Sequence, residues 1–376
     1  MRLNAGLLLP IVITIISCSH NTTSSNNDRT SLLNIGDPAP PLKVSNWLKG
    51  KPVQQYEKGK VYIIEFWATW CAPCKAAMPH LSDLSREYGE KVTIIGMDIM
   101  EKPTTPLQKI KDFVDSMGVN MDYTVAVQDS NFMEKEWLFA SGEQAIPQTF
   151  VVNQEGKLAW IGHPGKMSEV LNKVINKTWD IKEALNKRTS EKYLMKLDDS
   201  LNKVLMIYAE NRTKPGDTGM PDMALLKIEE IVDKEPALKY APLVAFHTFE
   251  ALLKTNPHKA YEYGKTAIAT STYQQTPCAF IIGCIDWHAD KLNLPAEIYR
   301  LGAEAYQAEI NDMLYPELVN IPRRYAKMAG WYWRANEKEK AIAAQTKAIE
   351  ELKKRKGISK EDLSFYEEQL MSYKNP

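Results

Sequence analysis

Two cysteines separated by two residues say more about the fold of this chain than any other sequence feature. Cys71 and Cys74 follow an apolar, β-branched run at residues 61–67 and precede a helical pattern. The sequence therefore predicts a buried strand that leads into a helix, with the cysteines at the junction. A thiol at a helix N-terminus faces unpaired backbone N–H groups, which favour the thiolate. This spacing suits thiol–disulfide exchange, in which Cys71 attacks a disulfide and Cys74 resolves the mixed disulfide.

The length and the net charge of the chain limit how many domains it can form and which partners it can bind. The chain has 376 residues, which is enough for two domains at about 100–200 residues each. Lysine plus arginine number 47 and aspartate plus glutamate also number 47. This balance gives no electrostatic reason to expect nucleic acid as a partner.

The first residues read as a leader rather than as part of the fold. Arg2 precedes an apolar stretch at 7–16, which is short for a membrane span, so residues 1–17 are predicted to be a signal peptide. The sequence Ile-Ile-Ser-Cys that ends at Cys18 resembles the lipobox of bacterial lipoproteins. The resemblance implies cleavage before Cys18 and lipidation of its sulfur; the alternative is an ordinary signal peptide cut near Ser19. Residues 18–33 are polar and predict a flexible tether, and Ser19 after the cysteine favours the periplasmic face of the outer membrane.

Strand and helix patterns alternate from residue 34 to residue 177. Strands are predicted at 42–47, 61–67, 92–97, 123–127, 150–152 and 158–161, the last two as a hairpin. Helices are predicted after the cysteines and at 106–117, 132–139 and 167–175. We therefore expect an α/β domain with a central mixed sheet over residues 34–177.

This pattern resembles the thioredoxin fold and, within it, the TlpA/ResA-type thiol-disulfide oxidoreductases. The resemblance rests on Trp-Cys-Ala-Pro-Cys at 70–74, on Pro79 inside the following helix, on Ile-Pro-Gln-Thr at 146–149, and on the extra helix and strand at about 104–127. It implies that Cys71 is the nucleophile and Cys74 the resolving cysteine. It also implies that Pro147 is cis and lies beside the cysteines, and that Ile146 and Trp70 contact the substrate.

Glu65 interrupts the apolar strand that precedes the cysteines. A buried carboxylate is costly unless it is paired or protonated, and burial raises its pKa. It stands where thioredoxins place a buried aspartate, so the resemblance implies a proton acceptor for Cys74. The alternative is a carboxylate that is satisfied by hydrogen bonds or reaches solvent.

A C-x-x-C pair can also be half of a zinc site, but no second pair follows at metal-ligand spacing. We therefore expect no metal and no cofactor. Cys278 and Cys284 are interpreted as buried thiols, with a disulfide between them as the alternative.

Long helical patterns fill residues 178–376, where an all-α domain is predicted. Residues 332–352 resemble one tetratricopeptide helix pair, and the residues near 256 and 294 resemble it more weakly. Their spacing of roughly 37–43 residues departs from the 34 of that repeat, so a solenoid and an irregular bundle both stay open.

Together these patterns predict a lipid-anchored, extracytoplasmic thiol-disulfide oxidoreductase of the bacterial cell envelope that acts through Cys71 and Cys74. The family resemblance implies that it reduces protein disulfides. The family resemblance also implies a membrane redox partner as electron donor. Two alternatives are an interaction lipoprotein whose helical domain binds partners, and a peroxiredoxin-like peroxidase.

Overall fold

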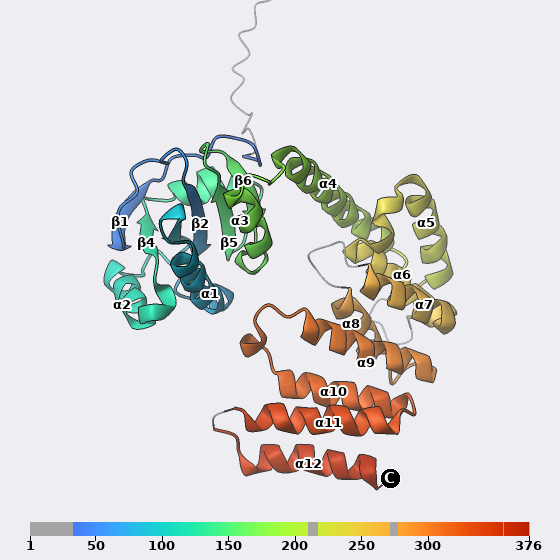
Figure 1. Cartoon of the computed structure of the whole chain (residues 1–376). Helices are drawn as coiled ribbons and strands as arrows, with labels where there is room; N and C mark the ends of the chain where they lie inside the picture. Colours follow the sequence, from blue (N-terminus) through green and yellow to red (C-terminus); the bar gives the residue numbers. More distant parts are fainter. Residues whose placement is uncertain (1–32, 210–216, 271–276, 356, 376) are drawn as a thin grey trace, which may run out of the picture.

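The computed structural model describes residues 33–209, 217–270, 277–355 and 357–375. The predicted leader at 1–17, the predicted lipidation site Cys18 and the predicted tether up to residue 32 lie outside these ranges. Within them, a thioredoxin-like α/β part is followed by a region of helices, as the sequence predicts (Figure 1). The predicted boundary between residues 177 and 178 stays a prediction.

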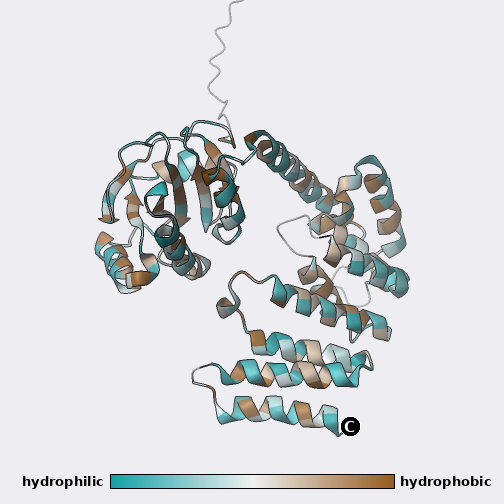
Figure 2. Cartoon of the chain, in the orientation of Figure 1, coloured by the Kyte–Doolittle hydropathy of each residue, from teal (hydrophilic) through white to brown (hydrophobic). Residues whose placement is uncertain are grey.

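A six-stranded mixed sheet forms the centre of the α/β part, in the order β1-β4-β3-β2-β5-β6. Strands β2, β3 and β4 are parallel, whereas β1 and β5 run antiparallel to β4 and β2, and β6 runs antiparallel to β5. Every residue of β2 is buried, as expected for a strand in the middle of a covered sheet. Figure 2 shows hydrophobic residues, in brown, along the strands of this sheet. The strands are β1 Val44–Lys49, β2 Val61–Trp67, β3 Val92–Asp98, β4 Thr124–Gln128, β5 Gln148–Val152 and β6 Leu158–Gly162.

Helices cover both faces of this sheet. The face that carries Ile63 and Trp67 packs against α1 (Ala72–Tyr88), α2 (Leu107–Met117) and α3 (Ser168–Ile175). The opposite face, which carries Ile64 and Phe66, packs against Ile35, Trp137 and the first turns of α4 (Ile181–Leu205). The first helix of the helical region is therefore also part of the α/β core.

Three predicted elements differ in detail from the structure. The strand expected at 150–152 is β5, which begins two residues earlier. The edge strand expected at 42–47 is β1, which begins and ends two residues later. The helix expected at 132–139 contains a π-helical segment, Glu134–Phe139, which buries Trp137 edge-on against Phe150.

The helical region continues with a series of packed helices, of which α9 to α12 form a layered stack in Figure 1. Several of them begin with proline in the first turn, where its missing N–H costs nothing. They are α5 Pro221–Lys234, α6 Pro242–Thr255, α7 Pro257–Ala269, α8 Cys278–His288, α9 Ala296–Asn311, α10 Ile321–Arg334, α11 Lys338–Lys353 and α12 Lys360–Lys374.

Residues 332–352, where the sequence resembles a tetratricopeptide helix pair, contain the end of α10, the turn after it and most of α11; the repeat itself stays a prediction. Cys278 and Cys284 both lie in α8 and are buried. Across the described ranges, none of the helices combines the length and apolar character that crossing a bilayer requires.

Candidate active site

Cys71 is the N-cap residue of α1. Its backbone is extended, and its Sγ accepts a hydrogen bond from the backbone N–H of Cys74 at 3.2 Å. The two sulfurs form a disulfide, and the Cα atoms are 5.3 Å apart. Cys71 is 3% exposed and Cys74 is 0% exposed. After reduction, the same helix N-terminus would stabilise a thiolate on Cys71 and so lower its pKa.

The residues before Cys71 are held by the segment that follows β3. The backbone N–H of Thr69 donates to Glu101 Oε1 at 2.5 Å, and Trp70 Nε1 donates to the carbonyl of Met100 at 3.0 Å. These bonds fix the turn from strand to helix, while the Trp70 ring stays 53% exposed beside the disulfide. An exposed indole at this position is available to a substrate.

Glu65 is fully buried in the middle of β2, between Gly96 of β3 and Thr149 of β5. Because side chains alternate along a strand, it lies on the face of Trp67, which packs in one apolar cluster with Cys71 and Cys74. Within the described part of the chain, neither carboxylate oxygen has a hydrogen-bond partner. Burial raises the pKa of Glu65 to about 8, so the group is mostly protonated at neutral pH.

Tyr123, which the sequence pattern predicts only as part of a strand, is a neighbour of Glu65. A Cβ atom at Gly96 would lie 2.8 Å from Tyr123 Cε2, so the absence of a side chain at Gly96 makes room for the phenol ring. Burial first, and the charge of Glu65 second, raise the pKa of Tyr123. Its hydroxyl is buried and lacks a hydrogen-bond partner among the described residues. No local sequence signal pointed to this contact.

Asp98 is a second buried carboxyl group, and the sequence analysis does not predict it. It ends β3 directly opposite Trp67 and is 1% exposed. Burial, followed by the charge of Glu101 and a hydrogen bond with it, raises the pKa of Asp98 to about 8. The available signal was an acidic residue at the end of the apolar run 92–97. Because Glu101 also binds Thr69, this acidic pair lies directly behind the turn that carries the cysteines.

The peptide bond between Ile146 and Pro147 is cis, as the family resemblance implies. Pro147 is buried and Ile146 is half-buried. Gln148, the next residue, pairs with Phe66 near the end of β2, which places the cis bond at the same edge of the sheet as the cysteines. That Ile146 and Pro147 contact the substrate stays a prediction.

The described residues contain no group of three or more histidine, cysteine or acidic side chains arranged to hold a metal ion.

A thioredoxin-like sheet whose central strand ends in a cysteine pair at a helix N-terminus, with a cis-proline at the same edge, defines a thioredoxin-like redox protein. The sequence profile of the AhpC/TSA family matches residues 35–161. Protein FixW of Rhizobium leguminosarum is 33% identical over 40% of this chain and 69% of its own length. Thiol-disulfide oxidoreductase ResA of Bacillus thuringiensis strain Al Hakam is 31% identical over 34% of this chain and 68% of its own length. The solution structure of a thioredoxin-like protein in the oxidized form superposes with a TM-score of 0.32 at 21% identity, over 40% of this chain and 98% of its own.

The chain therefore belongs to the family of ResA-like thiol-disulfide oxidoreductases. The resemblance covers the α/β part, and the helices that follow lie outside it.

Proposed function

We propose that this protein reduces disulfide bonds of other proteins through Cys71 and Cys74. The observation that carries the proposal is the cysteine pair itself, bonded to each other and placed at the N-terminus of α1. In the reduced enzyme, the Cys71 thiolate attacks a client disulfide, forms a mixed disulfide and releases one client thiolate. The Cys74 thiolate then attacks Cys71 Sγ, which closes the Cys71–Cys74 disulfide and releases the second client thiolate. Two electrons pass from the enzyme to the client.

Glu65 is the proton acceptor for Cys74 in this scheme. Its pKa, raised by burial to about 8, lies close to the value of about 8.5 for an ordinary thiol. A proton moves most readily between groups of similar pKa. At neutral pH most of Glu65 is protonated, so the fraction that is ionised takes the Cys74 proton, and this fraction grows as pH rises toward 8. Within the described residues, Glu65 has no hydrogen-bond partner. This supports the role, because no donor there stabilises the ionised carboxylate and lowers its affinity for a proton.

The cysteine roles are tested by two substitutions in the purified full chain. Reduced Cys74→Ser should accumulate a mixed disulfide with insulin, visible as a band of higher mass without reductant, because Cys71 attacks but nothing resolves the product. Cys71→Ser should form no such adduct and should reduce no insulin. Reduction of insulin by Cys71→Ser at the rate of the unmodified chain would contradict the assignment.

The enzyme acts outside the cytoplasm, anchored by lipid at Cys18 on the periplasmic face of the outer membrane, and receives electrons from a membrane redox partner. Support comes from the lipobox-like sequence at 15–18 and from the polar residues that follow it. In bacterial cells fed radiolabelled palmitate, the chain should be labelled and Cys18→Ser should not. Equal labelling of both would contradict the anchor.

A further inference from the structure

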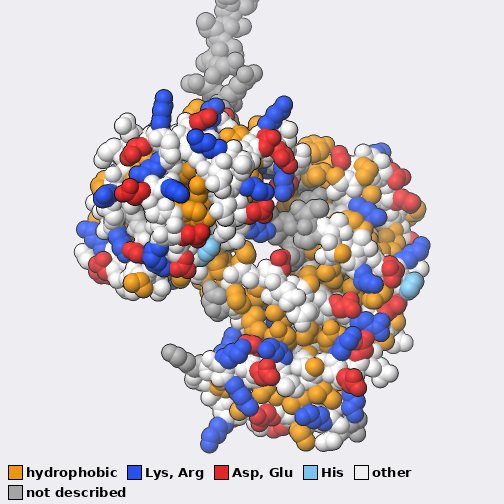
Figure 3. Space-filling view, viewed as in Figure 1, with side chains coloured by type: hydrophobic (Ala, Val, Ile, Leu, Met, Phe, Trp, Pro, Cys, Tyr) orange, Lys and Arg blue, Asp and Glu red, His pale blue; other side chains and the backbone are white. Residues whose placement is uncertain are grey.

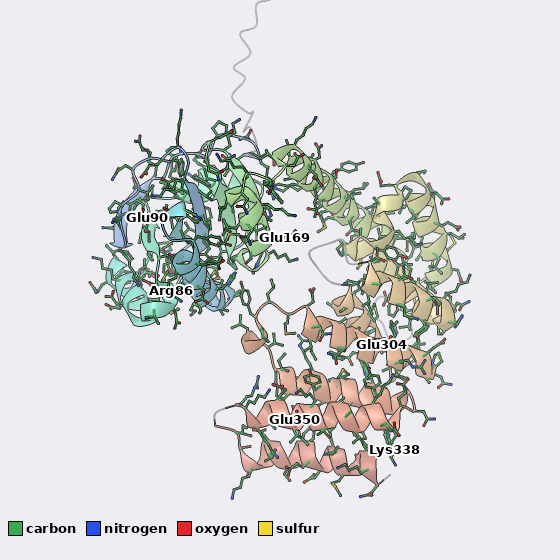
Figure 4. The ribbon with its side chains drawn as sticks, viewed as in Figure 1. Arg86, Glu90, Glu169, Glu304, Lys338 and Glu350 are labelled. Atoms are coloured by element: carbon green, nitrogen blue, oxygen red, sulfur yellow. A yellow bond between two sulfur atoms is a disulfide. The ribbon has the colours of Figure 1, made fainter. Side chains whose placement is uncertain are left out.

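The segment between α9 and α10 reaches from the helical region to the α/β part. It comprises residues 312–320 and contains a short 3-10 turn, η6 (Pro316–Leu318). Figure 1 shows this segment leaving the stack of helices toward the lower edge of the sheet domain. Figure 4 labels Glu169 on the first turn of α3, on the side of the α/β part that faces the helical region.

Direct contacts join this segment to the α/β part. The ring of Tyr315 lies 5.5 Å, centroid to centroid, from the imidazole of His163. A Cβ atom at Gly165 would lie 3.1 Å from Leu314 Cδ1, so Leu314 packs closely on the backbone there. The turn η6 also contacts α1, the helix that begins at the cysteine pair.

These contacts lie at the edge of the sheet that carries the cysteines. Strands β2 and β6 are both antiparallel to β5, so they run in the same direction and end at the same edge. Cys71 follows the end of β2, and His163 and Gly165 follow the end of β6. Met167, just beyond, is fully buried in the apolar cluster that contains Cys71 and Cys74. The segment 312–320 therefore lies at the same edge of the sheet as the redox site.

Apolar side chains from distant parts of the sequence are exposed along this edge. Trp70 is 53% exposed, and Leu314 and Leu318 are 44% and 46% exposed. Figure 3 shows hydrophobic side chains on both sides of the hollow between the α/β part and the helical region. Burial and nearby Lys166 lower the pKa of His163, so the imidazole beside Tyr315 is neutral at neutral pH and adds no charge to this surface.

We propose that residues 312–320 form one wall of the docking surface for client proteins, opposite Trp70, and that this surface binds an extended client segment with apolar side chains flanking its cysteine. The inference rests on the proposed function. A client must bring its disulfide to Cys71 Sγ, so the chain on either side of that disulfide passes over the edge that Trp70, Leu314 and Leu318 border. Burying these exposed apolar groups favours apolar neighbours of the client cysteine over polar ones. The helical region thus selects clients for the thioredoxin-like part.

The test compares two synthetic peptides, each with one internal disulfide, that differ only beside the cysteines. One carries leucine and phenylalanine there and the other carries serine. The reduced full chain should reduce the apolar peptide with a kcat/KM about tenfold higher than the polar peptide. The double substitution L314S/L318S should bring this ratio to about two or less, because it removes the apolar wall and leaves the cysteines untouched.

The matched control is M223S/L226S, which replaces two comparably exposed apolar residues on α5. This control variant should prefer the apolar peptide over the polar peptide by the same factor as the unmodified chain. Equal rates for the two peptides in the unmodified chain, or an unchanged preference in L314S/L318S, would overturn the docking surface. A wild-type dimer that L314S/L318S dissociates in sedimentation would also overturn it, by assigning the surface to a second copy. Failure to reduce either peptide would instead overturn the proposed function on which the inference rests.

Discussion

Glu65 lies where ionisation of a carboxyl group is unfavourable in free energy. It is surrounded by the apolar core beneath α1, and burial raises its pKa to about 8. Tyr123, Thr149 and Asp98 carry further buried polar atoms without partners in the described ranges. Such atoms normally cost stability, so a group of them behind a redox pair is consistent with proton movement during the reaction.

The kinetic prediction concerns Glu65→Gln. If Glu65 accepts the proton of Cys74, the amide cannot replace it, and resolution of the mixed disulfide at pH 7 should slow by about a hundredfold. Attack by Cys71 should be little affected, because its thiolate is stabilised by the helix N-terminus. Stopped-flow measurement of both steps from pH 6 to pH 9 checks this. An unchanged pH profile of the resolving step would remove Glu65 from the mechanism.

The same substitution predicts a pH-dependent stability. Between the unfolded pKa near 4.5 and the folded pKa of about 8, the folded state keeps the Glu65 proton and the unfolded state loses it. The free energy of unfolding therefore falls as pH rises through this window, by up to about 1.4 kcal/mol per pH unit. From pH 5.5 to pH 7.5, oxidised wild type should lose about 2 kcal/mol more stability than Glu65→Gln in urea unfolding. Asp98 titrates in both proteins, so its contribution to the free energy of unfolding cancels in the comparison. Parallel curves of unfolding free energy against pH would contradict the raised pKa of Glu65.

At the scale of elements, the close approach of α9 and α10 depends on Gly302. A Cβ atom there would overlap the ring of Trp331, which is buried. Gly302→Ala should therefore lower the free energy of unfolding by about 1–3 kcal/mol, as overpacking does in other cores.

Gly283 in α8 supplies the control, because nothing lies within 4 Å of its added Cβ. Gly283→Ala should stabilise the protein by about 0.5–1 kcal/mol, since alanine is the better helix former. Equal effects of the two substitutions in thermal unfolding would show that α9 and α10 are not packed as described.

The sequence predicted the elements whose pattern is local and strong. The apolar runs of β2 and β3, and the helix that begins after Pro106, lie within a residue of their predicted bounds. The π-helical geometry at Glu134–Phe139 could not be predicted from the sequence, because so short a segment does not distinguish the hydrophobic period of a π-helix from that of an α-helix. The contact between Tyr315 and His163 joins residues far apart in the chain, and no local pattern encodes which loop meets which edge.

At the candidate active site, too, the sequence predicted some of the residues and not others. The cysteine pair and Glu65 stand out in the sequence because their residue types are unusual at their positions. The cis bond at Pro147 was predicted from the family resemblance, and the structure shows it. Asp98 and Tyr123 were not predicted, because their place beside the site depends on the register that puts Asp98 opposite Trp67 and on the space left by Gly96.

At the scale of the molecule, α4 ties the two parts together. Arg188 on α4 donates to Glu143 Oε1 at 2.6 Å and to the carbonyl of Ser141 at 3.0 Å. This pair is largely shielded from solvent, so Arg188→Ala should cost about 1–2 kcal/mol and should loosen α4 from the sheet. Differential scanning calorimetry checks this. The control, Lys173→Ala, removes an exposed pair with Glu169 and should cost less than about 0.5 kcal/mol; equal costs would contradict a structural role for α4 at this junction.

The central claim is that Cys71 and Cys74 form a reversible, reducing redox pair, and its most direct test is the reduction potential of the purified full chain. The protein is equilibrated against glutathione buffers, and the fraction of Cys71–Cys74 disulfide is read by alkylation of the reduced cysteines, with Cys71→Ser as control. We predict a two-electron transition nearer to thioredoxin, at about −270 mV, than to the strong oxidant DsbA, at about −120 mV. A value near −120 mV would make the protein a donor of disulfides, and a pair that does not exchange with glutathione at all would contradict the account.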